Sequence, residues 1–273
     1  MNVKFFCPRW GSESIPFSTF INRVIEDEYN GVEISLPDSA SERSEYLAVL
    51  ADAGIPFILQ HHQTDKRTAD EYIPEFISRL EVLADAKPLF INSQTGKDFF
   101  SFEDNCRIIE KAIELETKSG IPIFHETHRG KFSFACHVMP AYLDVFPNMK
   151  ITADFSHWVN VSESLLEYQQ ETIERIIPHV HHVHSRVGYP EGPQVSHPGA
   201  PENKLFLERH LEWWDAIINK RKKQGNGEFT ITSEFGPIPY MPTLPFTAQP
   251  VSNQWEINKY MTTLLKERYN LKD

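Results

Sequence analysis

Eight short segments rich in β-branched and aromatic residues recur along this chain, and this repetition constrains the fold more than any other feature. They begin at Val3, Gly31, Ile55, Pro88, Ile121, Met149, Val180 and Phe229. The stretches between them have helical periodicity with start and stop signals, as in residues 39–54, which open with Ser39 and close at Gly54. Strands that alternate with helices predict a parallel sheet, and the count of eight favours a closed barrel over an open sheet. The absence of a GxGxxG motif after the first strand also argues against a dinucleotide-binding fold. We therefore expect an α/β protein with a (β/α)8 TIM barrel.

The length of 273 residues suits one barrel domain that spans residues 1–273, and we find no linker or composition shift that would mark a boundary. Two predicted loops, residues 188–204 and 237–254, are longer than a barrel requires. Both are rich in proline, which indicates ordered irregular structure. Long loops at the carboxyl ends of barrel strands usually cover a site.

The charge balance bears on partners and location. With 27 basic and 38 acidic residues, the net charge is -11, which disfavours binding to nucleic acid. The basic run from Lys220 to Lys223 is expected to end a helix, where cations suit the last carbonyls. The sequence shows no signal peptide or membrane-length apolar stretch, and its three cysteines lack a CxxC spacing. These features predict a cytoplasmic protein without a membrane or nucleic-acid partner.

Polar residues interrupt the ends of the last four predicted strands. The carboxylates are Glu126, Asp154 and Glu234, and the strand that begins at Val180 contributes His182 and His184. Three carboxylates in one barrel mouth repel one another unless a cation lies between them, and a divalent ion bound with an imidazole supplies that charge. The oxygen-rich ligand set favours Mn²⁺ first, with Mg²⁺, Co²⁺ or Zn²⁺ as alternatives.

The order of HETH (125–128), ADFSHW (153–158), HVHSR (182–186) and SEFGP (233–237) resembles the xylose isomerase-like superfamily of sugar isomerases and epimerases across the whole chain. Several members bind one divalent metal through Glu, Asp, His and Glu. The resemblance thus implies metal ligands at Glu126, Asp154, His184 and Glu234. It also implies the same (β/α)8 fold, and a homo-oligomer at the level of the family.

In the ketose 3-epimerase branch the two glutamates also move the proton, so the resemblance implies catalytic roles for Glu126 and Glu234. It implies substrate binding by His157 and Arg186, although Arg186 follows His184 more closely than in the epimerase pattern. We further expect His62 to line the pocket and Trp158 to stack on a sugar face. Gln94, Lys97, Arg129 and Lys131 are left open between substrate contacts and surface pairs.

The function expected from these features is metal-dependent isomerisation or epimerisation of a small carbohydrate, by removal of a proton next to a carbonyl. A dehydratase of the inosose or dehydroshikimate type is the alternative on the same site. A barrel that binds metal or carbohydrate without catalysis is the alternative from another class. An apurinic-site endonuclease is disfavoured by the net charge and the single four-ligand set.

Overall fold

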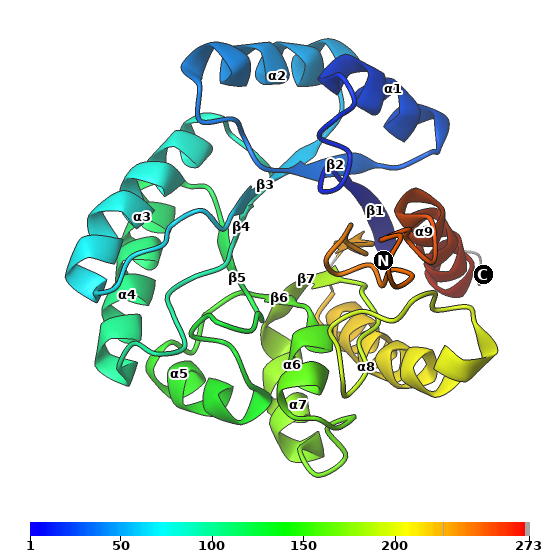
Figure 1. Cartoon of the computed structure of the whole chain (residues 1–273). Coiled ribbons are helices and arrows are strands. Elements are labelled where there is room, and N and C mark those ends of the chain that lie inside the picture. Colours follow the sequence, from blue (N-terminus) through cyan, green and yellow to red (C-terminus); the bar gives the residue numbers. More distant parts are fainter. Residues whose placement is uncertain (226, 271–273) are drawn as a thin grey trace.

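The computed structural model describes residues 1–225 and 227–270, and it shows eight parallel strands in a closed barrel (Figure 1). Each strand pairs with the next in the sequence, and β8 closes the ring on β1. This confirms the predicted (β/α)8 barrel. The strands are β1 (Asn2–Pro8), β2 (Gly31–Ile34), β3 (Phe57–His61), β4 (Ile91–Ser93), β5 (Ile123–Glu126), β6 (Ile151–Ala153), β7 (Val180–His184) and β8 (Glu228–Thr232).

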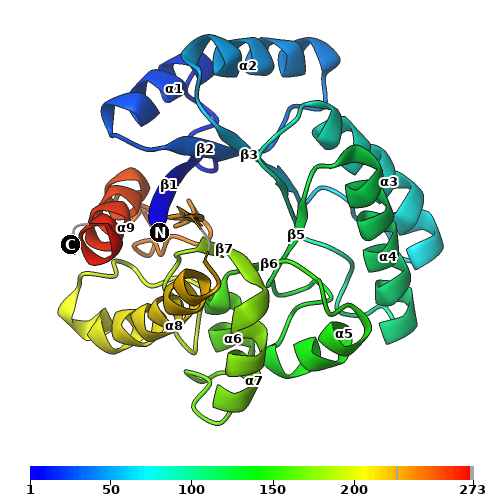
Figure 2. The same ribbon diagram turned by 180° about the vertical axis from the view of Figure 1, so that it is seen from behind.

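Helices surround the strands on the outside in both end-on views (Figures 1 and 2). Several begin where the sequence supplies a cap: the side chains of Ser39, Thr68 and Ser101 each accept a hydrogen bond from the first turn. The helices are α1 (Phe17–Glu26), α2 (Ala40–Ala53), α3 (Ala69–Asp85), α4 (Phe102–Ser119), α5 (Met139–Val145), α6 (Phe155–Val161), α7 (Gln170–Ile176), α8 (Lys204–Lys223) and α9 (Gln254–Tyr269), with short 3₁₀ turns at Cys136–Val138, Ile177–His179 and Pro201–Asn203. None of the described helices is both long and apolar enough to cross a membrane.

The connection between β6 and β7 differs from the sequence expectation. The pattern of residues 149–158 favours a strand that continues through Trp158, and the periodicity of residues 162–179 favours one helix. Instead β6 ends at Ala153, and the Asp154 side chain starts α6 by accepting a hydrogen bond from the Ser156 amide at 3.1 Å. Within residues 162–179 the α-helix covers only Gln170–Ile176, because the backbone at Glu163 and Leu166 takes positive φ values, which a helix cannot accommodate.

The inside of the barrel is apolar toward its amino-terminal end and polar toward its carboxyl-terminal end. Phe6, Ile58, Phe90 and Phe124 form a cluster separate from the large core that the helices cover. Side chains alternate across a strand, so these four fill the barrel interior while their neighbours face the helices. The centroid of the His182 ring lies 5.2 Å from that of Phe90. His182 is thus the first polar side chain above this apolar cluster.

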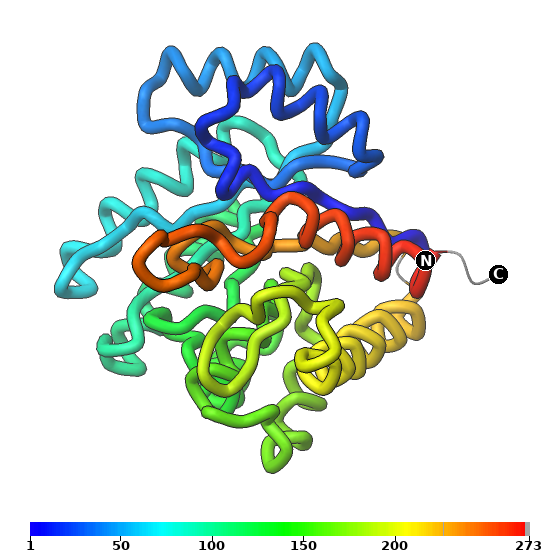
Figure 3. The backbone as a smooth tube through the Cα atoms, turned by 45° about the vertical axis from the view of Figure 1, so that its right-hand side comes forward, coloured from blue at the N-terminus to red at the C-terminus, as the bar shows by residue number. Residues whose placement is uncertain are grey.

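The two long loops lie on either side of α8 and α9. Residues 188–203 lead from β7 into α8 and contain one isolated antiparallel bridge and the 3₁₀ turn Pro201–Asn203. Residues 237–253 lead from β8 into α9 and contain one isolated antiparallel bridge. Figure 3 shows both as irregular backbone, the first in yellow-green and the second in orange. The loop from β8 carries Tyr240, whose ring packs against the guanidinium of Arg186.

Candidate metal centre and its cavity

Four side chains from consecutive strands converge at the carboxyl-terminal end of the barrel. Glu126 and His184 are the last residues of β5 and β7, Asp154 directly follows β6, and Glu234 follows β8 by two positions. His184 is level with Thr232 of β8 in the sheet register, so the strand ends place these groups at a common height. One ligand atom from each of the four lies within 4.8 Å of every other, and all four residues are buried.

The donor atoms of this cluster fit a divalent cation. Nδ1 of His184 lies 2.8 Å from Oε2 of Glu234 and 3.8 Å from Oε1 of Glu126. Yet neither Nδ1 of His184 nor Oε1 of Glu126 has a properly oriented hydrogen bond within the part of the chain described. Buried polar atoms are nearly always paired, and coordination to one cation would satisfy both. Three carboxylates with one imidazole nitrogen suit a borderline-to-hard ion. The structure brings the predicted ligands together, and the metal itself stays a prediction.

The pKa shifts of the cluster residues also favour a bound cation. Burial raises the pKa of Glu126 to about 8, and the neighbouring Glu234 and Asp154 carboxylates add to that effect. Burial on its own would lower the pKa of His184, but the surrounding carboxylates, Glu234 first, raise it well above the usual range. Both shifts favour the protonated forms of Glu126 and His184, which reduces the negative charge of the cluster when no cation is bound.

Arg186 lies against the cluster. Its guanidinium pairs with Asp154, contacts Nε2 of His157 at 2.7 Å and donates to Oγ of Ser156 at 3.1 Å. The same guanidinium lies 4.0 Å from Oε2 of Glu234 and stacks 4.9 Å from the Tyr240 ring. Arg186 is thus a buried cation that contacts a predicted metal ligand on one side and an aromatic ring on the other.

A cavity of about 520 Å³ opens above the cluster. Glu234 forms part of its wall, and Nε2 of Gln60 donates to Oε1 of Glu234 at 2.7 Å. The sequence predictions His62 and Arg186 also line this cavity. Its other walls are aromatic or polar, from Arg9, Trp10, Glu13, Ser35, Tyr46, Gln63, Gln94, His128 and Tyr240.

Two predicted substrate-binding residues are not in the cavity wall. His157 is fully buried on α6, and its ring lies 3.9 Å from that of His128, which does line the cavity. Trp158 is also fully buried; it stacks on Phe155 and donates its indole N–H to the Ser133 carbonyl. This position contradicts the expected stacking of Trp158 on a substrate. The cause is the early start of α6, which turns Trp158 into the core.

Sequence reasoning missed several polar residues on the first four strands. Glu33 of β2 and Asn92 of β4 are buried beneath the cluster: Asn92 donates to Oε1 of Glu33 and to Oε2 of Glu126, both at 3.0 Å. Gln60 of β3 reaches Glu234, as described above. The available signal was a charged or amide side chain inside an otherwise apolar strand.

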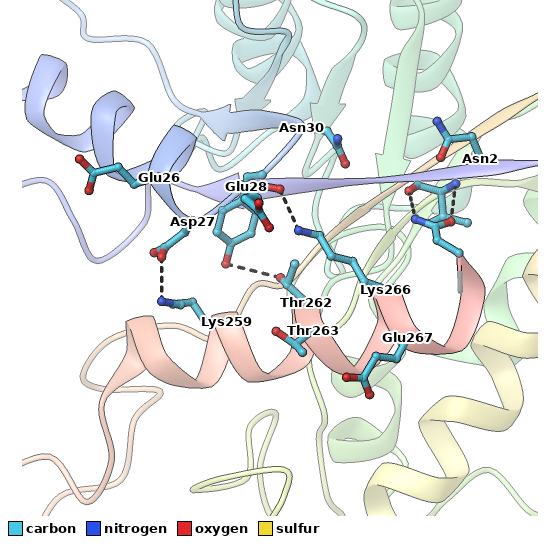
Figure 4. Close-up of a pocket in the computed structure, with 13 residues that line it drawn as sticks. Asn2, Glu26, Asp27, Glu28, Asn30, Lys259, Thr262, Thr263, Lys266 and Glu267 are labelled. Carbon is cyan, nitrogen blue, oxygen red and sulfur yellow. Dashed lines mark hydrogen bonds and ion pairs between the residues drawn. The ribbon is translucent and has the colours of Figure 1, made fainter. Parts of the chain in front are cut away.

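A second hollow, of about 670 Å³, lies at the opposite, amino-terminal end of the barrel between α9 and the segment after α1. Its polar groups largely pair with one another (Figure 4): Lys259 with Asp27 at 2.7 Å, and Lys266 with the Glu28 carbonyl at 2.8 Å. These contacts tie α9 to the start of the barrel. In TIM barrels the active site lies at the carboxyl-terminal end of the strands, so we assign this hollow a structural role, in which its contacts hold α9 against the barrel.

Comparison with known proteins gives matches in structure only. No protein-family model matches the sequence, and no curated protein matches it. The probable 3-DHS dehydratase AsbF of Bacillus anthracis aligns with a TM-score of 0.63 and 17% identity, over 98% of this chain and 100% of that one. The 3-keto-D-glucoside 4-epimerase YcjR of E. coli aligns with a TM-score of 0.61 and 11% identity, over 97% and 99%.

A family 2 AP endonuclease from Brucella melitensis aligns with a TM-score of 0.59 and 13% identity, over 86% of this chain and 93% of that one. These neighbours act on different substrates, and their identities to this chain are low, so the likeness concerns the fold and not the reaction. This chain shares its fold with all three, and that fold is the closed (β/α)8 barrel that the sequence pattern predicted.

Proposed function

We propose that this chain is a divalent-metal-dependent enzyme that removes a proton from the carbon next to a carbonyl of a small carbohydrate, and thereby isomerises or epimerises it. The supporting observation is the cluster of Glu126, Asp154, His184 and Glu234, whose donor atoms lie within 4.8 Å of one another beside a cavity of about 520 Å³. A bound divalent ion would polarise the carbonyl and its neighbouring hydroxyl, which makes the adjacent carbon-bound proton more acidic.

Glu126 and Glu234 are the proposed acid and base. Glu234 reaches the cavity, and the amide of Gln60 holds one of its carboxylate oxygens. Glu126 lies deeper in the cluster, where burial favours its protonated form. One glutamate would take the proton and the other would return it, to the opposite face for epimerisation or to the adjacent carbon for isomerisation. Such proton transfer typically contributes about 10²- to 10⁴-fold to the rate.

The cavity lining suits a polyhydroxylated substrate. The side chains of Gln60, Gln63 and Gln94 each offer a donor and an acceptor, so they can bind hydroxyl groups in either sense. Trp10 and Tyr240 provide aromatic surface against which the C–H face of a sugar ring can pack. Arg186 is placed to bind a substrate oxygen beside the cluster, because it both contacts Asp154 and lines the cavity.

A dehydratase is the second candidate, and the protonated form of Glu126 that burial favours supports it. After proton removal a dehydratase must protonate the hydroxyl that leaves, and Glu126 would supply that proton. The same proton abstraction would then end in an alkene or enol product.

The proposal is tested by incubating the Mn²⁺-loaded protein in D₂O with ketoses, aldoses, their phosphates and inososes, followed by NMR. Loss of a carbon-bound proton signal next to the carbonyl supports the proposal, and the labelled carbon separates isomerase from epimerase. An alkene or enol product identifies the dehydratase.

Glu126→Gln should abolish the exchange, whereas Glu13→Gln, which alters a cavity carboxylate outside the cluster, should retain it. Equal exchange rates in the two variants would refute the assignment of Glu126 as an acid or base. Substrate binding without exchange in the wild type would identify a non-catalytic binding barrel.

A further inference from the structure

Glu33 is a buried carboxylate that contacts a predicted metal ligand from the side opposite the metal cluster. It lies on β2 with no exposed surface, and its side chain is inside the barrel. Oε1 of Glu33 lies 2.9 Å from Nε2 of His184. Nδ1 of His184, the other ring nitrogen, is the atom that faces Glu126 and Glu234. The imidazole is therefore held between Glu33 and the cluster.

In the neutral imidazole, this contact favours a proton on Nε2. A carboxylate oxygen accepts hydrogen bonds, so Oε1 of Glu33 favours the form of His184 with a hydrogen on Nε2. That form leaves the Nδ1 lone pair free for a cation. A carboxylate on the far nitrogen also fixes the plane of the ring and makes the coordinating nitrogen more basic.

Neighbouring side chains hold Glu33 in turn. Oε2 of Glu33 accepts from the Thr232 hydroxyl and lies 3.2 Å from Nε2 of His182. Nδ1 of His182 lies 2.7 Å from the Thr230 hydroxyl. With this support and the Asn92 amide on Oε1, both oxygens of the carboxylate have partners on other strands. Its position is thus fixed before any cation binds.

Asn92 extends the arrangement to a second ligand. Its two amide hydrogens match two acceptors, Oε1 of Glu33 and Oε2 of Glu126, each 3.0 Å from Nδ2. The oxygen of Glu126 that Asn92 leaves unbound is Oε1, which is also the one without a hydrogen bond among the described residues. The two side chains thus direct one nitrogen of His184 and one oxygen of Glu126 toward the same point.

We propose that Glu33 is a positioning residue of the metal centre: it holds His184 with Nδ1 directed at the cation and, through Asn92, orients Glu126. This inference rests on the proposed metal centre. Glu33 would act without contacting the cation or the substrate. Burial of its charge has a desolvation cost, and the positioning of the metal ligands explains why a carboxylate is present there.

Glu33→Gln is the informative variant. Glutamine keeps the shape and one acceptor oxygen but removes the negative charge, so the barrel is expected to fold. The matched control is His182→Gln, which alters the other partner of the same carboxylate in the same buried layer but leaves the contact with His184 in place. Both variants should lower the thermal stability of the chelator-treated protein by similar amounts.

Metal binding should separate the two variants. We expect Glu33→Gln to weaken Mn²⁺ binding, measured by calorimetry, by about 10- to 100-fold, and His182→Gln to change it less than about threefold. The visible absorption of bound Co²⁺ should also shift in Glu33→Gln and not in His182→Gln, because only the first alters a ligand.

Wild-type Mn²⁺ affinity in Glu33→Gln, or equal losses in both variants, would overturn the inference and leave the metal centre intact. A wild-type protein that binds neither Mn²⁺ nor Co²⁺ would overturn the metal centre itself, and the inference with it.

Discussion

Replacing Arg186 by methionine should destabilise the metal-free protein more than the metal-loaded one. The guanidinium is 1% exposed, and its partner Asp154 is fully buried, so water does not screen the pair. Removal of one partner from such a pair leaves a buried unpaired charge, at a cost of about 3–5 kcal/mol. This is the loss expected for Arg186→Met in the presence of a chelator.

A divalent ion changes that balance because it supplies the missing positive charge beside Asp154 and Glu234. Loss of the Arg186 cation also removes repulsion toward the ion, and we expect Mn²⁺ to bind the variant at least tenfold more tightly. At saturating Mn²⁺, tenfold tighter binding narrows the difference in unfolding free energy between variant and wild type by about 1.4 kcal/mol.

The assay is urea unfolding of wild type, Arg186→Met and Arg186→Lys, each with chelator and with saturating Mn²⁺. Arg186→Lys keeps the charge and should lose less than half as much stability without metal. An equal loss of unfolding free energy in Arg186→Met with and without Mn²⁺, or a lysine variant as unstable as the methionine variant, would contradict this prediction.

Three further predictions concern stability. Burial lowers the pKa of His125 and His210 to about 4, so each takes up a proton on unfolding below pH 6.5. The unfolding free energy should therefore fall as pH drops from 6.5 to 4, by up to about 1.4 kcal/mol per pH unit for each histidine. His210→Gln should reduce this pH dependence, measured by urea unfolding. Lys131 is 7% exposed, and its ammonium has no ion pair or hydrogen bond within the described ranges. Lys131→Met should therefore raise the unfolding free energy by about 1 kcal/mol. A decrease of the unfolding free energy by the same amount would contradict this prediction. Gly188→Ala would place a Cβ 2.7 Å from a backbone oxygen of α6 and should cost about 1–3 kcal/mol by thermal unfolding. Gly227→Ala should not, because no described residue other than its chain neighbours comes within 4 Å of the added Cβ.

The strand order could be predicted from local sequence pattern, and the four candidate ligands from that pattern together with the family resemblance of the motifs. Alternation of apolar strands with capped helices specifies a parallel barrel, and a parallel barrel brings its strand ends together. Glu126, Asp154, His184 and Glu234 each stand at or just beyond the end of an apolar run. Their spatial neighbourhood then follows from the fold.

Trp158 shows where this reasoning failed. Asp154 followed by Ser156 is a helix start, since the aspartate side chain accepts from the serine amide. A strand that continued through Trp158 would have left this side chain at the mouth of the barrel. The helix instead turns it onto Phe155 in the core. The cap signal was in the sequence and competed with the apolar strand pattern.

Glu33 could not be assigned from the sequence because its partners are distant along the chain. Its contact with His184 joins residues 151 positions apart, and Asn92 links it to Glu126 on a third strand. Each residue alone resembles an ordinary polar interruption of a strand. Only the closed barrel, with its interior filled from all sides, shows that they meet beneath the cluster of candidate ligands.

We propose that Glu126, Asp154, His184 and Glu234 together hold one catalytic divalent ion. The most direct test is a crystal structure of the Mn²⁺-soaked protein with data collected at the manganese absorption edge. We expect one strong anomalous peak in the barrel, bonded to Nδ1 of His184 and to oxygens of the three carboxylates. Its absence at full soak, or a peak bound by other residues, would contradict the claim.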